Sequence, residues 1–232
     1  MAEHRAGRRP GRPPRSTAPP TRERLLDAAL DLFAEKGFAA TSVRQIAEAV
    51  GVRDSAIYGH FSGKQEIFDT LLGSVGLLEL GAVGTDAATL AELGPARALP
   101  ALAGRVIDAF DQPRARKFAS VMMREGLYGR AAGSRSLAQS IADVQAQLHE
   151  PFRHWAKAGL LRDDFPPEQL VWELLAPLAN IRFVYLHAQA TPEERRDGRE
   201  FAERHVRFFL ACVLREPGEG APRDPQRAAS PD

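Results

Sequence analysis

The sequence is poor in residues that would cross-link the chain or anchor it in a membrane. It has a single cysteine among 232 residues, Cys212, so no disulfide can form within the chain. The most apolar stretch, residues 170–186, is interrupted by a glutamate, a proline, an asparagine and an arginine. This pattern predicts a buried helix and not a membrane span. The N-terminus also lacks the apolar run of a secretory signal. We therefore expect a cytoplasmic protein with no membrane partner.

Net charge is also low, at +1, but it is unevenly distributed. Residues 1–64 contain eleven lysines and arginines against seven acids, whereas the remainder contains twenty against twenty-three. Five arginines and one acid lie among the prolines and glycines of the first sixteen residues. Such a composition predicts a disordered basic arm over residues 1–20. The segment "RPGRPPR", centred on Arg12, suits entry into a DNA minor groove, and the alternative is a solubilising tail.

Three helices are predicted after the arm from apolar residues that recur with a period of 3.6. The first begins near Thr21 and stops at Gly37. The second is capped by Thr41 or Ser42 and ends at Gly51. The third covers about residues 54–60. Two short helices joined by a tight turn and packed on a longer one predict a helix-turn-helix unit.

The segment "LLDAALDLFAEKGFAATSVRQIAEAVGVRDSAIYGHFSGKQEIF", residues 25–68, resembles the DNA-binding domain of the TetR family of bacterial transcriptional regulators. The resemblance implies an all-α fold of about nine helices and a homodimer that binds a palindromic operator. It also implies a repressor that a small effector releases from DNA. The expected division is a helix-turn-helix domain over 21–66, an effector-binding and dimerisation domain over 67–215, and a disordered tail over 216–232.

The predicted recognition helix presents small side chains on the face opposite Ile57. Steps of 100° per residue place Ser55 and Gly59 on that face, with Ala56 and Tyr58 on its flanks. Small residues let the helix approach closely, so that the Ser55 hydroxyl can hydrogen-bond a base and the Ala56 methyl can touch a thymine methyl.

Two residues depart from the family pattern. Arg53 stands where a serine usually caps the recognition helix, so we expect capping by Asp54 or Ser55. Gly59 replaces an aromatic or polar residue, which costs about 1 kcal/mol of helix propensity relative to alanine.

Longer contacts to DNA must come from charged and aromatic side chains. Arg44 is the candidate for bidentate guanine recognition, and the alternatives are a phosphate contact or a solvated side chain. Lys64 lies in the first turn of the next helix, where the helix dipole disfavours a cation unless an anion compensates. A DNA phosphate would do so, and the family resemblance implies that role. Tyr58 and His60 are expected to bind phosphates, although His60 also fits a packing role. The predicted DNA-contacting residues are Thr41, Ser42, Arg44, Arg53, Ser55, Ala56, Tyr58, Gly59, His60, Lys64 and, in the arm, Arg12.

The remaining chain predicts further helices over about 64–80, 95–110, 114–128, 134–158, 167–187 and 192–215. Aromatic residues and methionines among them favour a pocket for a hydrophobic or aromatic effector. The predicted pocket residues are Phe110, Phe118, Met122, Tyr128, Phe152, Trp155 and Trp172. The last two helices suit an intersubunit four-helix bundle, with a single crowded core as the alternative. The predicted interface residues are Leu174, Leu178, Ile181, Tyr185, Phe201, His205, Phe208 and Cys212.

The sequence leaves two other classes of function open. The first is an enzyme, because "HEPFRH", residues 149–154, resembles a zinc motif. Its histidines are five residues apart, about 140° around a helix, and a proline separates them, so no metal site or cofactor is expected. The second is an architectural protein that binds DNA without sequence preference through the basic arm.

Overall fold

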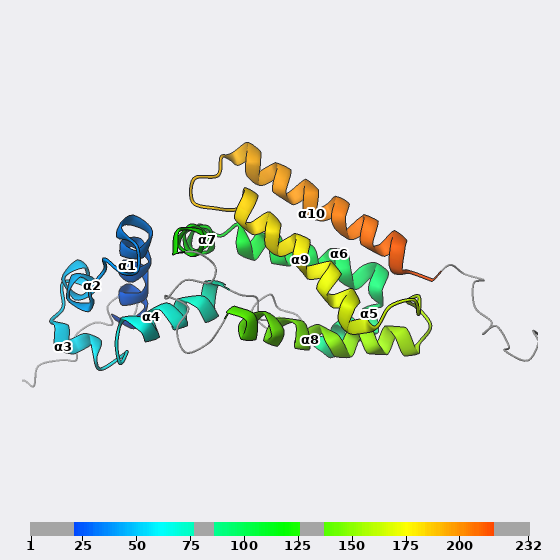
Figure 1. Cartoon of the computed structure of the whole chain (residues 1–232), viewed down its shortest axis with the longest axis horizontal. Helices are drawn as coiled ribbons and strands as arrows, with labels where there is room; N and C mark the ends of the chain where they lie inside the picture. The colour runs from blue at the N-terminus through cyan, green and yellow to red at the C-terminus, as the bar shows by residue number, and fades with distance from the viewer. Residues whose placement is uncertain (1–20, 77–85, 126–136, 216–232) are drawn as a thin grey trace, which may run out of the picture.

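The computed structural model describes residues 21–76, 86–125 and 137–215, and over these ranges helices are the regular structure, with turns between them and one isolated bridge between Leu161 and Leu214. Ten α-helices and one π-helical turn, η1, follow one another along these ranges (Figure 1). Their bounds are α1 Thr21–Lys36, α2 Val43–Val50, α3 Asp54–Ile57, α4 Lys64–Leu71, η1 Leu72–Gly76, α5 Ala87–Leu93, α6 Pro95–Phe110, α7 Pro113–Glu125, α8 Leu137–Lys157, α9 Pro167–Tyr185 and α10 Pro192–Val213.

Helices α1–α4 form the N-terminal unit at one end of the molecule (Figure 1). Ser42 and Gln45 make a reciprocal capping box that starts α2, and Gly51 ends the helix in the left-handed conformation with φ of 75°. The apolar faces of these helices are buried in one cluster around Phe33, Ile46 and Ile57. The predicted helix-turn-helix arrangement is therefore present.

Helix α7 packs on the N-terminal unit although the sequence places it among the helices of the second half. Its residues Phe118, Val121 and Met122 are buried in the same cluster as Phe68 of α4. The rings of Phe68 and Phe118 are 5.6 Å apart between centroids. Figure 1 shows α7 between the N-terminal unit and the other helices. It is thus one element through which the two halves of the described chain meet, and Phe183 of α9 packs against the same cluster.

Helices α5, α6, α8, α9 and α10 enclose the second core. Phe152 and Trp155 of α8 are fully buried there, and the Trp155 indole donates a hydrogen bond of 2.9 Å to the Ala91 carbonyl of α5. That bond satisfies the polar atom of a buried aromatic ring. None of the helices in the described ranges is long and apolar enough to cross a bilayer.

The helices differ from the sequence predictions at three places. The helix predicted over 64–80 is α-helical only to Leu71 and continues as η1 to Gly76, and the end of that range lies outside the described residues. Helix α3 stops at Ile57 and not near His60, and the turn after it is closed by the amides of His60 and Phe61, which both donate to the Ile57 carbonyl at 2.8 Å. Helix α5 was not predicted, although Asp86 caps it through the Thr89 amide and Gly94 ends it. With α5, the described residues form ten α-helices where the family resemblance implied about nine.

Candidate DNA-binding surface and effector-domain cavities

The end of α3 and the turn after it present an uncovered surface. Ser55, Gly59 and His60 are exposed, and the Tyr58 side chain is 62% exposed. Ala56 is half-buried, and Ile57 is fully buried, as the helical geometry predicts. This face is therefore free to meet a DNA groove. The arm residue Arg12 lies outside the described residues.

Two arginines border this surface. Arg44 of α2 is exposed and its Nε lies 2.8 Å from Glu48 one turn later. The hydrogen bond to Glu48 raises the pKa of Arg44. Arg53 is the N-cap residue of α3 and makes no capping hydrogen bond through its side chain, so the expected shift of the cap to Asp54 or Ser55 is wrong. Both side chains are exposed, and the contact of Arg44 with Glu48 uses its Nε.

Thr41 does not belong to the exposed surface. Its side chain is only 2% exposed, and its hydroxyl donates a hydrogen bond of 2.8 Å to the Gly37 carbonyl. The adjacent Ser42 is exposed and caps α2. The prediction that Thr41 contacts DNA is corrected on this ground, because its hydroxyl closes the loop between α1 and α2.

Lys64 is turned away from the phosphate role that its helix position suggested. Its ammonium donates hydrogen bonds of 2.6 Å to the carbonyls of Phe38 and Thr41, and a longer one of 3.4 Å to Ala39. It also lies 4.4 Å from the centroid of the Phe38 ring. Burial lowers the pKa of Lys64, and the carboxylate of Glu125 opposes that shift. The lysine therefore binds the loop that precedes α2.

The first turn of α4 already holds an anion. The Ser62 amide donates a hydrogen bond of 2.6 Å to the Glu66 carboxylate, and this bond lowers the pKa of Glu66. The N-cap residue Gly63 provides no side-chain cap. A carboxylate here satisfies the positive end of the helix dipole, which makes the site less favourable for a DNA phosphate.

The predicted pocket residues are not brought together. Phe118 and Met122 lie in the core of the N-terminal unit, because α7 faces α1 and α4. Phe110, Phe152 and Trp155 lie in the second core. Trp172 is 51% exposed on the outside of α9. Tyr128 lies outside the described residues. A single pocket lined by all of these residues is therefore excluded.

A small apolar cavity lies between α6, α8 and α9. Its volume is about 70 Å³. Of the predicted pocket residues it includes Phe110. The lining residues share an apolar character and are Val106, Phe110, Ile141, Val144, Leu175, Leu178 and Ala179.

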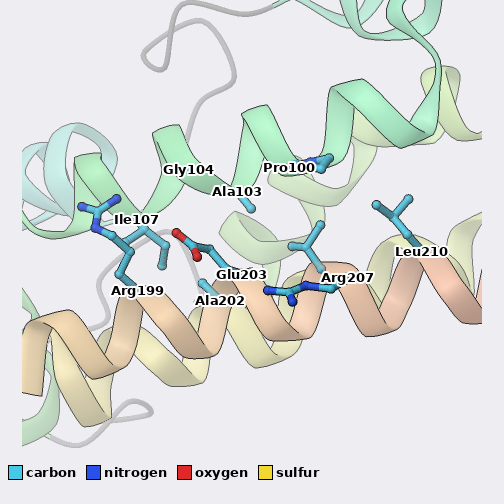
Figure 2. Close-up of a pocket in the computed structure, with 10 residues that line it drawn as sticks. Pro100, Ala103, Gly104, Ile107, Arg199, Ala202, Glu203, Arg207 and Leu210 are labelled. Carbon is cyan, nitrogen blue, oxygen red and sulfur yellow. The ribbon is translucent and has the colours of Figure 1, made fainter.

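A larger groove of about 430 Å³ runs between α6 and α10. Figure 2 shows Pro100, Ala103 and Ile107 of α6 on one side, facing the side chains of α10. The α10 side carries charges of both signs on Arg199, Glu203 and Arg207. Because this groove is charged along one edge, it differs in chemistry from the cavity beside Phe110.

Arg182 of α9 is a buried cation next to the small apolar cavity that Phe110 lines. It is 2% exposed, and burial lowers its pKa to about 10. Its guanidinium carbon lies 4.6 Å from the centroid of the Phe110 ring, and its Nη2 donates a long hydrogen bond of 3.4 Å to the Ala115 carbonyl of α7. One side chain thus joins the cavity wall to α7.

The predicted interface residues divide into buried, half-buried and exposed groups. Leu174, Leu178 and Ile181 are buried in the core of their own chain, which corrects their assignment to an intersubunit interface. Tyr185 is half-buried and stacks on Phe201, and the His205 ring nitrogen lies 3.0 Å from the Leu174 carbonyl.

The exposed group lies on the outer face of α10. Phe201 and Phe208 are 43% and 69% exposed, and Cys212 is an exposed free thiol. Phe208 and Cys212 border a groove of about 450 Å³ between α9 and α10, which Phe165 and Pro177 also line. An apolar surface of this kind is typical of a protein interface.

Comparisons with known proteins agree with this architecture. Residues 25–71 match the model of the bacterial regulatory proteins of the tetR family. The regulator TtgW of Pseudomonas putida is 33% identical over 108 residues, which are 46% of this chain and 75% of TtgW. The chain belongs to the TetR family. TtgW and SrpR, both of Pseudomonas putida, are transcriptional regulators and not enzymes. The zinc-enzyme alternative is therefore wrong.

Two further relatives of this TetR-family chain extend the comparison. The regulator SrpR of Pseudomonas putida is 30% identical over 142 residues, or 61% of this chain, and the match spans 63% of SrpR. The structure of SmeT bound to triclosan has a TM-score of 0.65 at 22% identity, covering 88% of this chain and 96% of SmeT. A second structure describes SmeT as the repressor of the Stenotrophomonas maltophilia multidrug efflux pump SmeDEF. At this identity the likeness to SmeT shows a shared fold.

Proposed function

We propose that this TetR-family regulator is a repressor that binds a palindromic operator as a homodimer and is released by a small hydrophobic or aromatic effector. The observation that carries the DNA-binding part is the exposed surface at the end of α3, where Ser55, Tyr58, Gly59 and His60 are uncovered beside a buried Ile57. Arg44 and Arg53 flank this surface and supply cations for bases or phosphates. The arm with Arg12 adds contacts in the minor groove.

The dimer forms through the outer face of α9 and α10. Phe201, Phe208 and Cys212 recur along one side of α10, and the groove beside Phe208 is wide enough to accept side chains of a second copy. A twofold axis through this face would place the same residues of both subunits against one another. To bind a palindrome, such a dimer must place its two recognition helices about one turn of DNA apart.

The effector enters the apolar space beside Phe110. Its lining is apolar throughout, whereas the groove between α6 and α10 carries Arg199, Glu203 and Arg207. A drug-sized ligand needs a pocket of about 300 Å³ or more. Because the cavity holds about 70 Å³, binding requires α6, α8 and α9 to move apart. The complex of SmeT with the aromatic molecule triclosan supports this chemical class.

Selection of binding sites from random DNA tests the proposal. The full-length protein should enrich one palindrome, and a footprint on it should persist at a salt concentration that abolishes binding to random DNA. Gly59→Glu, which places an anion on the exposed surface, should abolish the footprint. Glu150→Ala, on the exposed side of α8, is the matched control and should bind normally. Equal binding to random DNA at matched salt would favour the architectural alternative.

Triclosan serves as the first effector probe in the same experiment. It should reduce the footprint of the wild-type protein and raise its unfolding temperature, since a ligand that binds the folded state stabilises it. Activation of transcription from the selected site in a reporter strain, in place of repression, would contradict the repressor assignment.

A further inference from the structure

Helix α7 carries a row of polar contacts to α1. Arg114 Nε lies 3.1 Å from the Asp27 carboxylate, and Lys117 pairs with Asp31. The contacts follow the same order along both helices and continue to the C-terminal end of α1. Exposed ion pairs of this kind each contribute about 0–1 kcal/mol, so they align the helices without fixing them.

Two stronger contacts lie at the end of the row. The Arg124 guanidinium donates hydrogen bonds of 2.8 Å to the carbonyls of both Ala34 and Glu35. The last carbonyls of a helix have no partner within it, and a cation there complements the helix dipole. Arg124 therefore caps α1 from a neighbouring helix.

Glu125 completes the arrangement on the next residue of the chain. Its carboxylate accepts a hydrogen bond of 2.8 Å from the Phe38 amide. The Phe38 carbonyl is held on its other side by Lys64 at 2.6 Å. Gly37 has φ of +86°, and a Cβ there would lie 2.9 Å from the Glu125 carboxylate. The backbone that joins α1 to α2 is thus held between α4 and α7, and a side chain at residue 37 would require the Glu125 carboxylate to shift.

Helix α7 is also bound to the other half of the molecule. The Ala188 amide, beyond the end of α9, donates a hydrogen bond of 2.9 Å to the Ser120 hydroxyl. Arg116 forms an ion pair of 2.8 Å with Asp111, which Arg195 of α10 also approaches at 3.2 Å. A change in the angle between the N-terminal unit and α7 must therefore break the contacts of Arg124 and Glu125 or carry α7 along.

We propose that Glu125 and Arg124 are positioning residues that hold the helix-turn-helix unit on the effector domain and so fix the distance between the two recognition helices of the dimer. The inference rests on the proposed dimeric function. Glu125 binds the Phe38 amide, four residues before the α2 cap Ser42, and Arg124 binds carbonyls in the last turn of α1. We therefore expect them to control the orientation of α2 and α3 and not their chemistry.

An operator series of different spacing tests this role. The series contains the selected palindrome and versions whose centre is longer or shorter by one or two base pairs, which rotates and displaces the half-sites. The wild-type protein should prefer its selected spacing by more than about tenfold, a difference of ~1.4 kcal/mol. Glu125→Ala should bind that spacing about tenfold more weakly, a loss within the free energy of one charge-assisted hydrogen bond. The affinities of this variant for the different spacings should differ by less than about threefold.

Two variants serve as controls for chemistry and for fold. Glu125→Gln keeps an oxygen that can accept from the Phe38 amide, so it should retain most of the spacing preference. Glu150→Ala, an exposed acid far from α1, should match the wild type. Hydrogen exchange should show faster exchange of the Phe38 amide in Glu125→Ala while the core amides of α8 stay protected. Should Glu125→Ala fail to fold, Arg124→Met removes the other contact and should flatten the same preference.

The outcomes separate this inference from the proposed function. An equal loss of affinity at every spacing, or a profile that matches the wild type in a folded variant, overturns the positioning role of Glu125 and Arg124. Failure of the wild-type protein to select a palindrome overturns the proposed function instead. A flattened profile in both Glu125→Ala and Arg124→Met, with Glu125→Gln close to wild type, supports the inference.

Discussion

Replacement of Lys64 distinguishes a structural lysine from a DNA-contacting one. Its ammonium makes two hydrogen bonds of 2.6 Å to the carbonyls of Phe38 and Thr41 and lies over the Phe38 ring. Hydrogen bonds that involve a charged group contribute about 1.5–3 kcal/mol each, but burial of the ammonium opposes part of that gain, as the lowered pKa of Lys64 indicates. We therefore expect Lys64→Met, which keeps the apolar stem, to cost about 2–3 kcal/mol of the free energy of unfolding.

The assay combines thermal unfolding with the salt dependence of operator binding. A loss of this size should lower the unfolding temperature by about 5–10 °C for a chain of this length. Lys36→Ala, which removes an exposed lysine at the end of α1, is the matched control and should change it by little. The slope of log affinity against log salt should stay at the wild-type value, because the ammonium is already bound to carbonyls.

The opposite pattern would refute this reasoning. Each phosphate contact contributes about 0.9 to the magnitude of that slope for double-stranded DNA. An unchanged unfolding temperature together with a slope that falls by about one contact would show that Lys64 leaves the loop and binds a phosphate in the complex, as the family resemblance implied.

Three other variants test separate parts of the molecule. Arg44→Ala should weaken binding by about 1–3 kcal/mol at one symmetric base position if the side chain leaves Glu48 to bind guanine, and equal losses across operator variants in a binding titration would instead indicate a phosphate contact. Phe208→Glu should produce monomers in analytical ultracentrifugation, because it places an uncompensated charge in the proposed interface, and an unchanged dimer mass would contradict that interface. Deletion of residues 1–18 should leave the unfolding temperature unchanged but weaken binding where A·T tracts narrow the minor groove, whereas equal affinity would favour the solubilising tail.

The predictable part of this structure is the part governed by local sequence. Helix starts and ends at Gly37, Ser42 and Gly51 follow from capping chemistry and from backbone conformations that glycine favours, and the burial of Ile57 follows from helical period. These features depend on neighbours within a few residues. For the same reason, Asp86 before α5 and Gly94 after it were signals that sequence reasoning could have used.

The part that could not be predicted depends on partners far along the chain. Lys64 has a position that suits a phosphate, and only the fold shows that the carbonyls of Phe38 and Thr41 occupy its ammonium. Phe118 has the aromatic side chain expected of a pocket residue, but α7 directs it toward Phe68. Glu125 gives no local signal at all, because its partner is the Phe38 amide, 87 residues away.

We propose that Arg182 links the effector cavity to the DNA-binding unit. Phe110 lines that cavity, and the Arg182 guanidinium lies over its ring while it donates to the Ala115 carbonyl at the start of α7. The end of α7 binds the backbone before α2 through Glu125. Movement of the ring can therefore reach the helix-turn-helix unit through a single rigid helix.

Arg182→Met tests that path, because it removes the guanidinium while keeping a side chain of similar length. Burial of the guanidinium carries a desolvation cost, as the lowered pKa of Arg182 indicates, and an apolar side chain of similar length removes that cost, so the variant should fold and bind the operator. In the wild-type protein the effector should weaken operator binding, and the operator should weaken effector binding, by the same factor, commonly about 5- to 150-fold. Titration of the effector with and without operator measures that factor directly.

In Arg182→Met this coupling factor should fall toward one, while the affinity for the effector alone changes little. An undiminished factor would show that the signal reaches α7 by another route. Unequal factors in the two directions would show that one of the titrations had not reached equilibrium, because linkage requires them to be equal.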